Sequence, residues 1–203
     1  IDVLNKKTVL YKDDDILGST YDIADLDADQ LALAEKAYAE LLEAVADVDE
    51  QIGEMFLMEE TISVADLKAG LRRATIANEL VPIAGGSAFK NKGVQYLLDA
   101  VVDYLPSPLE IPPAEGLDPN GEKKTVRVET TDDAKFCALA FKLWADKYFG
   151  KLIFFRIYSG TVSKGDMIYH PRTQTQERVG RLIQVQADKH EEIETCFAGD
   201  IAA

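Results

Sequence analysis

The sequence of 203 residues predicts an α/β region followed by an antiparallel β region. Up to residue 105, most apolar residues recur at helical spacing, with short strand-like runs between them. After residue 113, apolar and polar residues alternate, as they do in strands with one buried face. Between the two patterns, residues 106–113 (PSPLEIPP) hold four of the seven prolines, which marks this segment as the domain boundary.

The first predicted element is a β-hairpin or a β-meander over residues 1–24. Two runs, IDVLNKKTVLY and STYDIADL, have the composition of strands, and a polar turn at residues 12–15 with Gly18 joins them.

A long amphipathic helix is predicted next. Asp27 and Asp29 are its N-cap candidates, and its apolar positions run from Leu31 to Ile52 with acidic residues between them. Residues 1–60 hold 17 acidic and 4 basic side chains, a net charge of −13, whereas the remaining residues carry −1. The acidity of the chain therefore belongs to this first region.

Three further elements are predicted before the boundary. A second helix starts at Ser63, with Asp66 at capping-box spacing, and ends near residue 78. Residues 80–84 (LVPIA) predict a short strand whose proline limits pairing on one side. A third helix is predicted over residues 92–105, because apolar residues from Val94 to Leu105 fall on one side. That side needs a large surface to pack on.

In the β region, strand-length runs separated by short turns predict an antiparallel barrel or sandwich. The runs are TVRVET, FCALAFKLW, KLIFFRIYSGTV, DMIYH and ERVGRLIQVQA. The two cysteines, Cys137 and Cys196, lie within strand-like runs and are predicted to be reduced core thiols.

Small and polar residues are concentrated at residues 85–95 (GGSAFKNKGVQ), between the predicted strand and the third helix. At such a junction, small residues let a ligand approach backbone N–H groups, and Ser87 adds a hydroxyl. Glycines equally suit a plain turn in which they serve only the geometry. Spacing alone leaves both interpretations open.

The residues from position 85 onward, GGSAFKNKGVQYLLDAVVDYLPSP, resemble the segment that closes the GTP-binding domain of the bacterial elongation factor G family. FGKLIFFRIYSGTVSKGD and GRLIQVQADKHEEIETCFAGDIAA are similar to the start and middle of that family's second domain, a β-barrel. The acidic opening resembles the insert that the family carries inside its GTPase domain. The resemblance covers essentially the whole chain, which we expect to be an internal fragment.

The resemblance implies three parts. Residues 1–79 correspond to the acidic α+β insert of an α/β GTPase domain, and residues 80–105 to the last strand and helix of that domain. Residues 106–203 correspond to an incomplete second-domain β-barrel, the second domain of translation factors.

The implied parent protein is a cytoplasmic, ribosome-dependent GTPase that drives translocation of tRNA and mRNA. Tetracycline-protection proteins and release factor three share this architecture, although GSAFKNKGVQ and DYLPSP look most like elongation factor G. An alternative of another class is a non-catalytic adaptor module that uses the acidic helix and the barrel as binding surfaces.

The resemblance also implies three sets of contacts. The guanine base would meet Ser87, Ala88 and Phe89. The ribosomal stalk protein would dock on Glu35, Glu40, Glu43 and Asp47. Small-subunit ribosomal RNA would meet Lys151, Arg156, Lys164, Arg172, Arg178 and Arg181. The last two sets are equally explained as solvated charged surfaces.

The motifs of phosphoryl transfer are missing from these residues. The phosphate loop G-x-x-x-x-G-K-[ST] does not occur, and GEKKT at Gly121 does not replace it. Asp15 to Gly18 spells D-x-x-G but lies in the predicted hairpin. GTP or GDP with Mg²⁺ is therefore expected in the parent protein, with no cofactor and no catalytic residue in this chain, which alone should not hydrolyse GTP.

Other sites are not predicted. His170 and His190 have no further ligand at metal-site spacing, and the aspartates at 13–15 lack the spacing of a calcium loop. No apolar run approaches the roughly 20 residues that cross a membrane, so no membrane partner is expected.

We predict that the chain self-associates. In an intact GTPase domain, the apolar side of the helix at 92–105 would cover a sheet, and most of that sheet would lie upstream of Ile1. The side must instead pack on residues 80–84, on the insert helices or on another molecule. Light scattering at low micromolar concentration should show oligomers. A monomer without dye-binding apolar surface would contradict this prediction.

Overall fold

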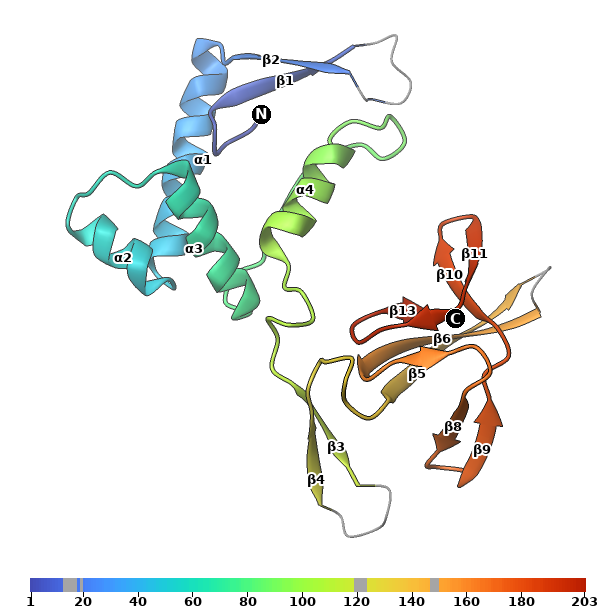
Figure 1. The fold of residues 1–203 in the computed structure, drawn as a ribbon. Helices are drawn as coiled ribbons and strands as arrows, with labels where there is room; N and C mark the ends of the chain where they lie inside the picture. The colour runs from blue at the N-terminus through green and yellow to red at the C-terminus, as the bar shows by residue number, and fades with distance from the viewer. Residues whose placement is uncertain (13–17, 19, 119–123, 147–149) are drawn as a thin grey trace. The chain divides into compact units, whose positions relative to one another are not determined.

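The computed structural model describes residues 1–12, 18, 20–118, 124–146 and 150–203 (Figure 1). The aspartates at 13–15, most of the D-x-x-G sequence and the start of GEKKT lie outside the described residues. The chain divides into two compact units, Ile1–Ser107 and Pro108–Ala203. No helix in the described part of the chain is long and apolar enough to cross a membrane.

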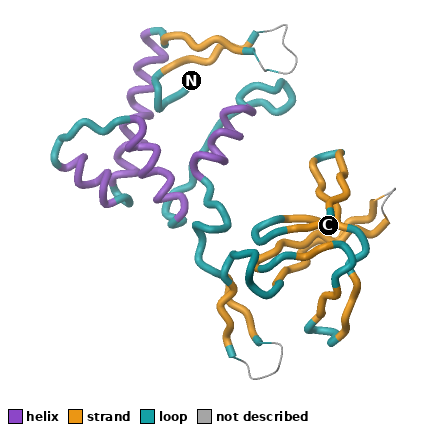
Figure 2. The backbone as a smooth tube through the Cα atoms, in the orientation of Figure 1, coloured by secondary structure: helices purple, strands orange, loops and turns teal. Residues whose placement is uncertain are grey.

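The first unit opens with the predicted hairpin. Strands β1 (Lys7–Tyr11) and β2 (Tyr21–Asp25) pair antiparallel, from Lys7 opposite Asp25 to Tyr11 opposite Tyr21. The hairpin prediction is confirmed over these strands. Four helices follow it in the chain (Figure 2).

The predicted long helix is two helices, α1 (Ala28–Ala46) and α2 (Glu50–Leu57). Asp27 caps α1 in a capping box with Gln30, whereas Asp29 lies in the first turn. The chain leaves the helix after Ala46 because Asp49 adopts an extended backbone, and its carboxylate accepts a hydrogen bond from the N–H of Ile52 at 3.0 Å. An aspartate that bonds a nearby backbone N–H starts a new helix more readily than it continues an old one.

Helices α3 (Val64–Ile76) and α4 (Val94–Tyr104) agree with the predictions. Ser63 and Asp66 form the expected capping box of α3. The first unit has one main cluster of buried apolar side chains, drawn from α1 to α4. It contains Val45, Ile52, Leu67, Leu71 and Tyr104.

Asp49 and Arg73 join the helices of this cluster. The Arg73 guanidinium donates to both carboxylate oxygens of Asp49, from Nε and Nη2, at 2.8 Å each. Asp49 is only 7% exposed. The hydrogen bonds from Arg73 lower the pKa of Asp49 and outweigh the opposing effect of burial. One buried carboxylate therefore caps α2 and ties it to α3.

The predicted strand at 80–84 is not formed. No described strand pairs with these residues, and Val81 and Ile83 are 82% and 95% exposed. The apolar side of α4 is also exposed, with Leu97 at 51% and Val102 at 77%. Helix α4 instead contacts α3 through its end, where Lys68 binds Asp103 at 2.8 Å. Among the described residues, the apolar side of α4 therefore lacks the large packing surface that the sequence pattern predicts.

The second unit consists of short antiparallel strands, as predicted. They are β3 (Ala114–Leu117), β4 (Thr125–Val128), β5 (Cys137–Asp146), β6 (Gly150–Ser159), β7 (Val162–Ser163), β8 (Met167–His170), β9 (Thr175–Arg178), β10 (Leu182–Gln186), β11 (Lys189–Ile193), β12 (Thr195–Cys196) and β13 (Ile201–Ala202). The three-stranded sheet has the order β13-β6-β5, and the other strands form two-stranded pairs. The described strands do not close into a ring.

Neighbouring residues of these strands point to opposite faces and enter different clusters. Leu182 and Ala202 belong to one cluster, whereas Ile183 and Ala203 belong to the other. Cys196 is fully buried in the first, and this burial raises the pKa of its thiol. The prediction of two core thiols is wrong for Cys137, which is free but exposed because it begins the edge strand β5.

We expect Asp49→Ala to lower the free energy of unfolding of this chain by about 2 kcal/mol, because it removes a helix cap and charged hydrogen bonds to a half-exposed partner. Asp49→Asn should cost less, since an amide oxygen still caps α2. Chemical denaturation would measure both, with the exposed Asp47→Ala as the control, which should change stability by less than about 0.5 kcal/mol.

The same pair predicts a pH dependence. Because folding lowers the pKa of Asp49, its ionic contribution is complete above the ordinary value of 3.8 and is lost as the pH falls below it. The difference in stability between the wild type and Asp49→Asn should therefore shrink in acid. An Asp49→Asn protein as stable as the wild type at neutral pH would show that the ion pair contributes nothing.

Candidate functional site

The loop between α3 and α4 has a defined turn at its tip. Ser87 and Lys92 form an antiparallel bridge, with the Ser87 N–H donating to the Lys92 carbonyl at 2.8 Å and the Lys92 N–H donating back at 3.0 Å. Within it, the Asn91 N–H donates to the Ala88 carbonyl at 3.2 Å, and Asn91 has a φ of 52°. This bridge presents residues 88–91 together, although no strand precedes them.

The hairpin contacts the end of this loop and the start of α4. The N–H of Gly93 donates to the Tyr11 hydroxyl at 2.8 Å, and the Gln95 side chain donates to the Gly18 carbonyl at 2.8 Å. The rings of Tyr21 and Tyr96 lie 5.8 Å apart. Sequence reasoning missed these supports, because a tyrosine in a predicted strand carries no signal of what its hydroxyl will contact.

Gly93 is required where the loop turns into the helix. Its φ is 83°, and a Cβ there would lie 3.0 Å from the Gly85 carbonyl oxygen and 3.1 Å from Gly86. A side chain would meet both a strained backbone and a crowded space. Gly93 thus serves the geometry of the turn, which was one of the two interpretations of the glycines in the sequence.

The tip itself is open to solvent. Phe89 is 98% exposed and Ala88 is exposed, whereas Ser87 is half-buried. The Ser87 N–H is already bonded to Lys92, while the N–H groups of Ala88 and Phe89 donate to no acceptor among the described residues. Exposed amides of this kind can meet the acceptor edge of a flat polar ligand. The arrangement thus fits a base contact at Ala88 and Phe89 better than at the Ser87 amide.

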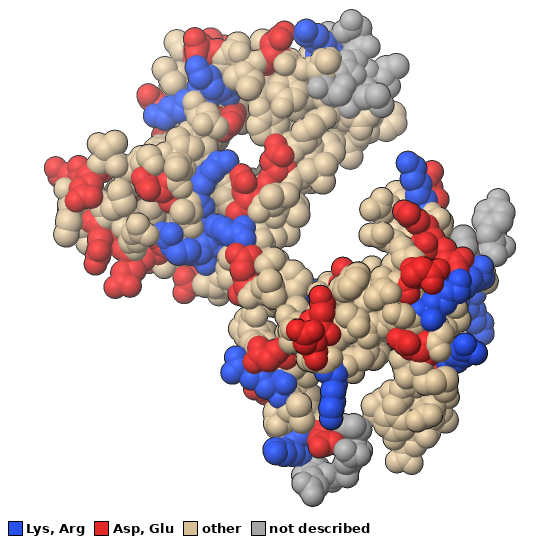
Figure 3. Space-filling view, in the orientation of Figure 1, with Lys and Arg blue, Asp and Glu red and all other residues tan. Residues whose placement is uncertain are grey.

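The acidic residues singled out in the sequence lie on α1 or at its end. Glu35, Glu40, Glu43 and Asp47 are all exposed, and Lys36 lies 3.9 Å from Glu40. In Figure 3 acidic side chains also gather over α2 and its surroundings. The first unit therefore has a broad negative surface, and the acidic residues of α1 form part of it (Figure 3).

Two of the basic residues of the second unit are bonded to neighbouring groups. Lys164 contacts Glu192 at 2.6 Å and Glu194 at 3.9 Å, and the hydrogen bond to Glu192 raises the pKa of Lys164. Arg178 donates from Nε to the Gly165 carbonyl at 3.2 Å. These two side chains stabilise the joins between strands as well as carrying charge.

The other four cations lie on β6 or next to β9 and β10 in the chain. Lys151 is exposed on β6, and Arg156 lies over the Tyr158 ring at 5.6 Å. Arg172 is exposed in the turn between β8 and β9, and Arg181 is exposed directly before β10. Among the described residues, no group of His, Cys, Asp and Glu side chains is placed to hold a metal ion.

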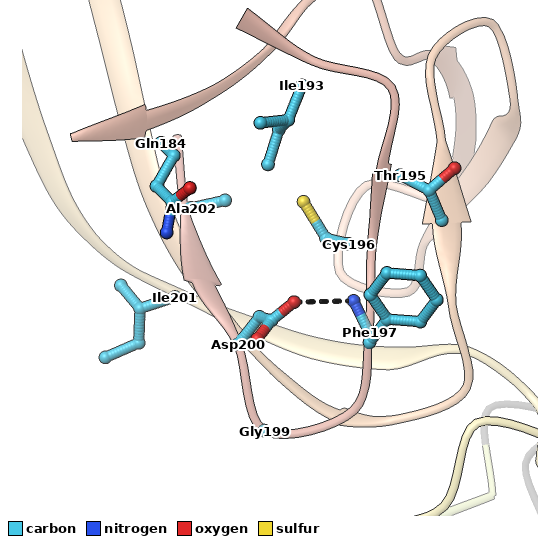
Figure 4. Close-up of a pocket in the computed structure, with 9 residues that line it drawn as sticks. All are labelled: Gln184, Ile193, Thr195, Cys196, Phe197, Gly199, Asp200, Ile201 and Ala202. Atoms are coloured by element: carbon cyan, nitrogen blue, oxygen red, sulfur yellow. Dashed lines mark hydrogen bonds between the residues drawn. The ribbon is translucent and has the colours of Figure 1, made fainter. Parts of the chain in front are cut away.

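A hollow in the second unit contains none of the predicted site residues. The Cys196 sulfur points between Ile193 and Ala202, and the Asp200 carboxylate accepts a hydrogen bond from the Phe197 N–H at 2.8 Å (Figure 4). Its lining consists of Gln184, Ile193, Thr195, Cys196, Phe197, Gly199, Asp200, Ile201 and Ala202. Because Asp200 closes the turn before β13, its charge has a structural role.

A crystal structure of a protein from Thermus thermophilus has a similar fold. The TM-score is 0.72 at 24% sequence identity, and the match covers all of this chain but 27% of the other. The chain thus spans about a quarter of the length of that protein.

Residues 135–203 match the family model of elongation factor G domain 2. The match begins just before β5 and includes every strand from β5 to β13. The antiparallel fold of the second unit and this match agree with each other. Residues 135–203 of the second unit are therefore similar in sequence to domain 2 of elongation factor G, and the antiparallel strands there agree with that similarity.

Proposed function

We propose that the chain is an internal part of a ribosome-dependent GTPase that drives the translocation of tRNA and mRNA. The domain 2 match at residues 135–203 carries this proposal, since elongation factor G proteins are GTPases of translation. In this proposal the first unit contributes the acidic insert and the final helix of the GTPase domain, and the second unit is an incomplete β-barrel. The cations of the second unit would contact small-subunit ribosomal RNA.

The loop at residues 87–89 would contact the guanine base. Its support is the exposed pair of amides at Ala88 and Phe89, held in place by the Ser87–Lys92 bridge. The phosphates and Mg²⁺ would bind elsewhere in the parent protein, because the chain has no phosphate loop. A base contact alone gives weak binding, since it must offset the cost of immobilising the ligand.

Ala88→Glu in the parent protein should weaken GDP binding by at least about tenfold, because a bulky anion would occupy the point where the base approaches. Titration with a fluorescent GDP analogue measures the change. Ala65→Glu makes the same substitution at an exposed position of α3 and should leave the affinity unchanged. Equal affinities of both variants and the wild type would rule out the base contact.

The acidic face of α1 would dock the ribosomal stalk protein. Reversal of Glu35, Glu40 and Glu43 to lysine in the parent should slow ribosome-stimulated GTP turnover several-fold at low salt, because attraction between opposite charges speeds encounter. The loss should diminish as salt rises and screens these exposed charges. An unchanged rate at low salt would identify the face as an ordinary solvated surface.

A further inference from the structure

A groove between α1, α2 and the start of α3 has an apolar floor. Tyr38 and Leu42 of α1 face Phe56 and Leu57 at the end of α2, and Ile62 follows on the way to α3. Tyr38, Leu42 and Ile62 also pack against the buried cluster of the first unit. The floor therefore continues from the core and does not depend on loose side chains.

Part of this apolar surface is open to solvent. Phe56 is 46% exposed, Leu57 83% and the adjacent Met58 68%. The exposed surface of these three successive apolar residues adds nothing to the stability of the unit. Contiguous apolar surface of this kind marks an interaction site.

The rim of the groove contains acidic residues. Glu59 and Glu60 line it after α2. Their backbones close that helix, with N–H groups donating to Phe56 at 3.2 Å and Met55 at 3.0 Å, so both carboxylates are held beside the floor. On α1, Glu35 precedes Tyr38 by three residues and therefore lies next to it on the helix surface. The one cation recorded against the floor residues in the described structure is Lys6, whose Nζ lies 4.9 Å from the Tyr38 ring.

We infer that this groove binds an amphipathic helix whose apolar stripe is flanked by lysine or arginine. An apolar floor between two helices accepts a helix with apolar residues at three- and four-residue spacing. The acidic residues at the rim require positive charges beside the apolar stripe of the partner, and they disfavour an acidic or neutral helix. The inference takes the positive charge of the partner from the proposed docking function and rests on that proposal to this extent. It differs in assigning most of the binding energy to Phe56 and Leu57 and not to the acidic residues of α1.

The two surfaces share Glu35, but they can be separated elsewhere because Glu40 and Asp47 lie on a different side of α1 from the groove floor. Leu33, Glu40 and Asp47 are spaced by seven residues, so they share one side of the helix. Tyr38 and Leu42 are on the side toward the core. Leu33, which is 64% exposed, therefore provides a matched control for Leu57.

The probe is a fluorescent 18-residue peptide of leucine and lysine with one apolar helical stripe, titrated into the 203-residue chain. Leu57→Ser should weaken binding about tenfold, and Leu33→Ser should leave it unchanged. The same peptide with glutamate in place of lysine should not bind. Amide chemical-shift changes should centre on Tyr38, Leu42, Phe56, Leu57 and Ile62.

Different outcomes would overturn different statements. If Leu33→Ser or Glu40→Lys weakens binding and Leu57→Ser leaves it unchanged, the partner binds on the acidic side of α1. That result would refute the groove and keep the docking proposal. Equal binding of a scrambled peptide of the same composition would reduce the effect to non-specific charge attraction and refute the groove as well. Loss of stalk-dependent turnover is measured separately and does not decide this test.

Discussion

The bidentate contact between Asp49 and Arg73 is the constraint on which the first unit depends. Asp49 is buried, and it must be bonded because an unpaired carboxylate in that place would be costly. Its bond to Ile52 starts α2, and its bonds to Arg73 fix α3 against both earlier helices. Gly70 permits this close approach, since a Cβ there would come within 2.5 Å of Ile52. The groove between α1 and α2 depends on the turn of the chain at this point.

The same turn connects stability to the surfaces we propose as functional. By ending α1 at Ala46, it folds α2 back so that Phe56 and Leu57 come beside Tyr38 and Leu42. A continuous helix would have placed these side chains far apart along its axis. The groove is therefore a consequence of one capping residue, and the acidic rim belongs to the segment that links α2 to α3.

The loop at residues 85–95 and the second unit depend on long-range contacts in different ways. Tyr11 and Gly18 hold the base of the loop through hydrogen bonds to Gly93 and Gln95, residues that follow them by more than 70 positions in the chain. In the second unit, short strands alternate their side chains between two clusters, so that Leu182 and Ile183 stabilise opposite faces. The fold of this unit rests on that alternation, which the sequence shows directly.

The sequence by itself determined the paired strands at the start, the capping box at Ser63, a helix within residues 92–105 and the antiparallel character of the second unit. These features follow from local periodicity and capping, which act within a few residues. Only the tertiary structure decided that α1 ends at Ala46, that residues 80–84 form no strand and that Cys137 is exposed. Each of these depends on residues distant in the sequence. Arg73 binds Asp49 where α1 has ended, no described strand pairs with residues 80–84, and Cys137 begins a strand at the edge of its sheet. The guanine contact stays a prediction of the resemblance, but which amides of the loop are open was decided by the Ser87–Lys92 bridge, a pairing that no local pattern reveals.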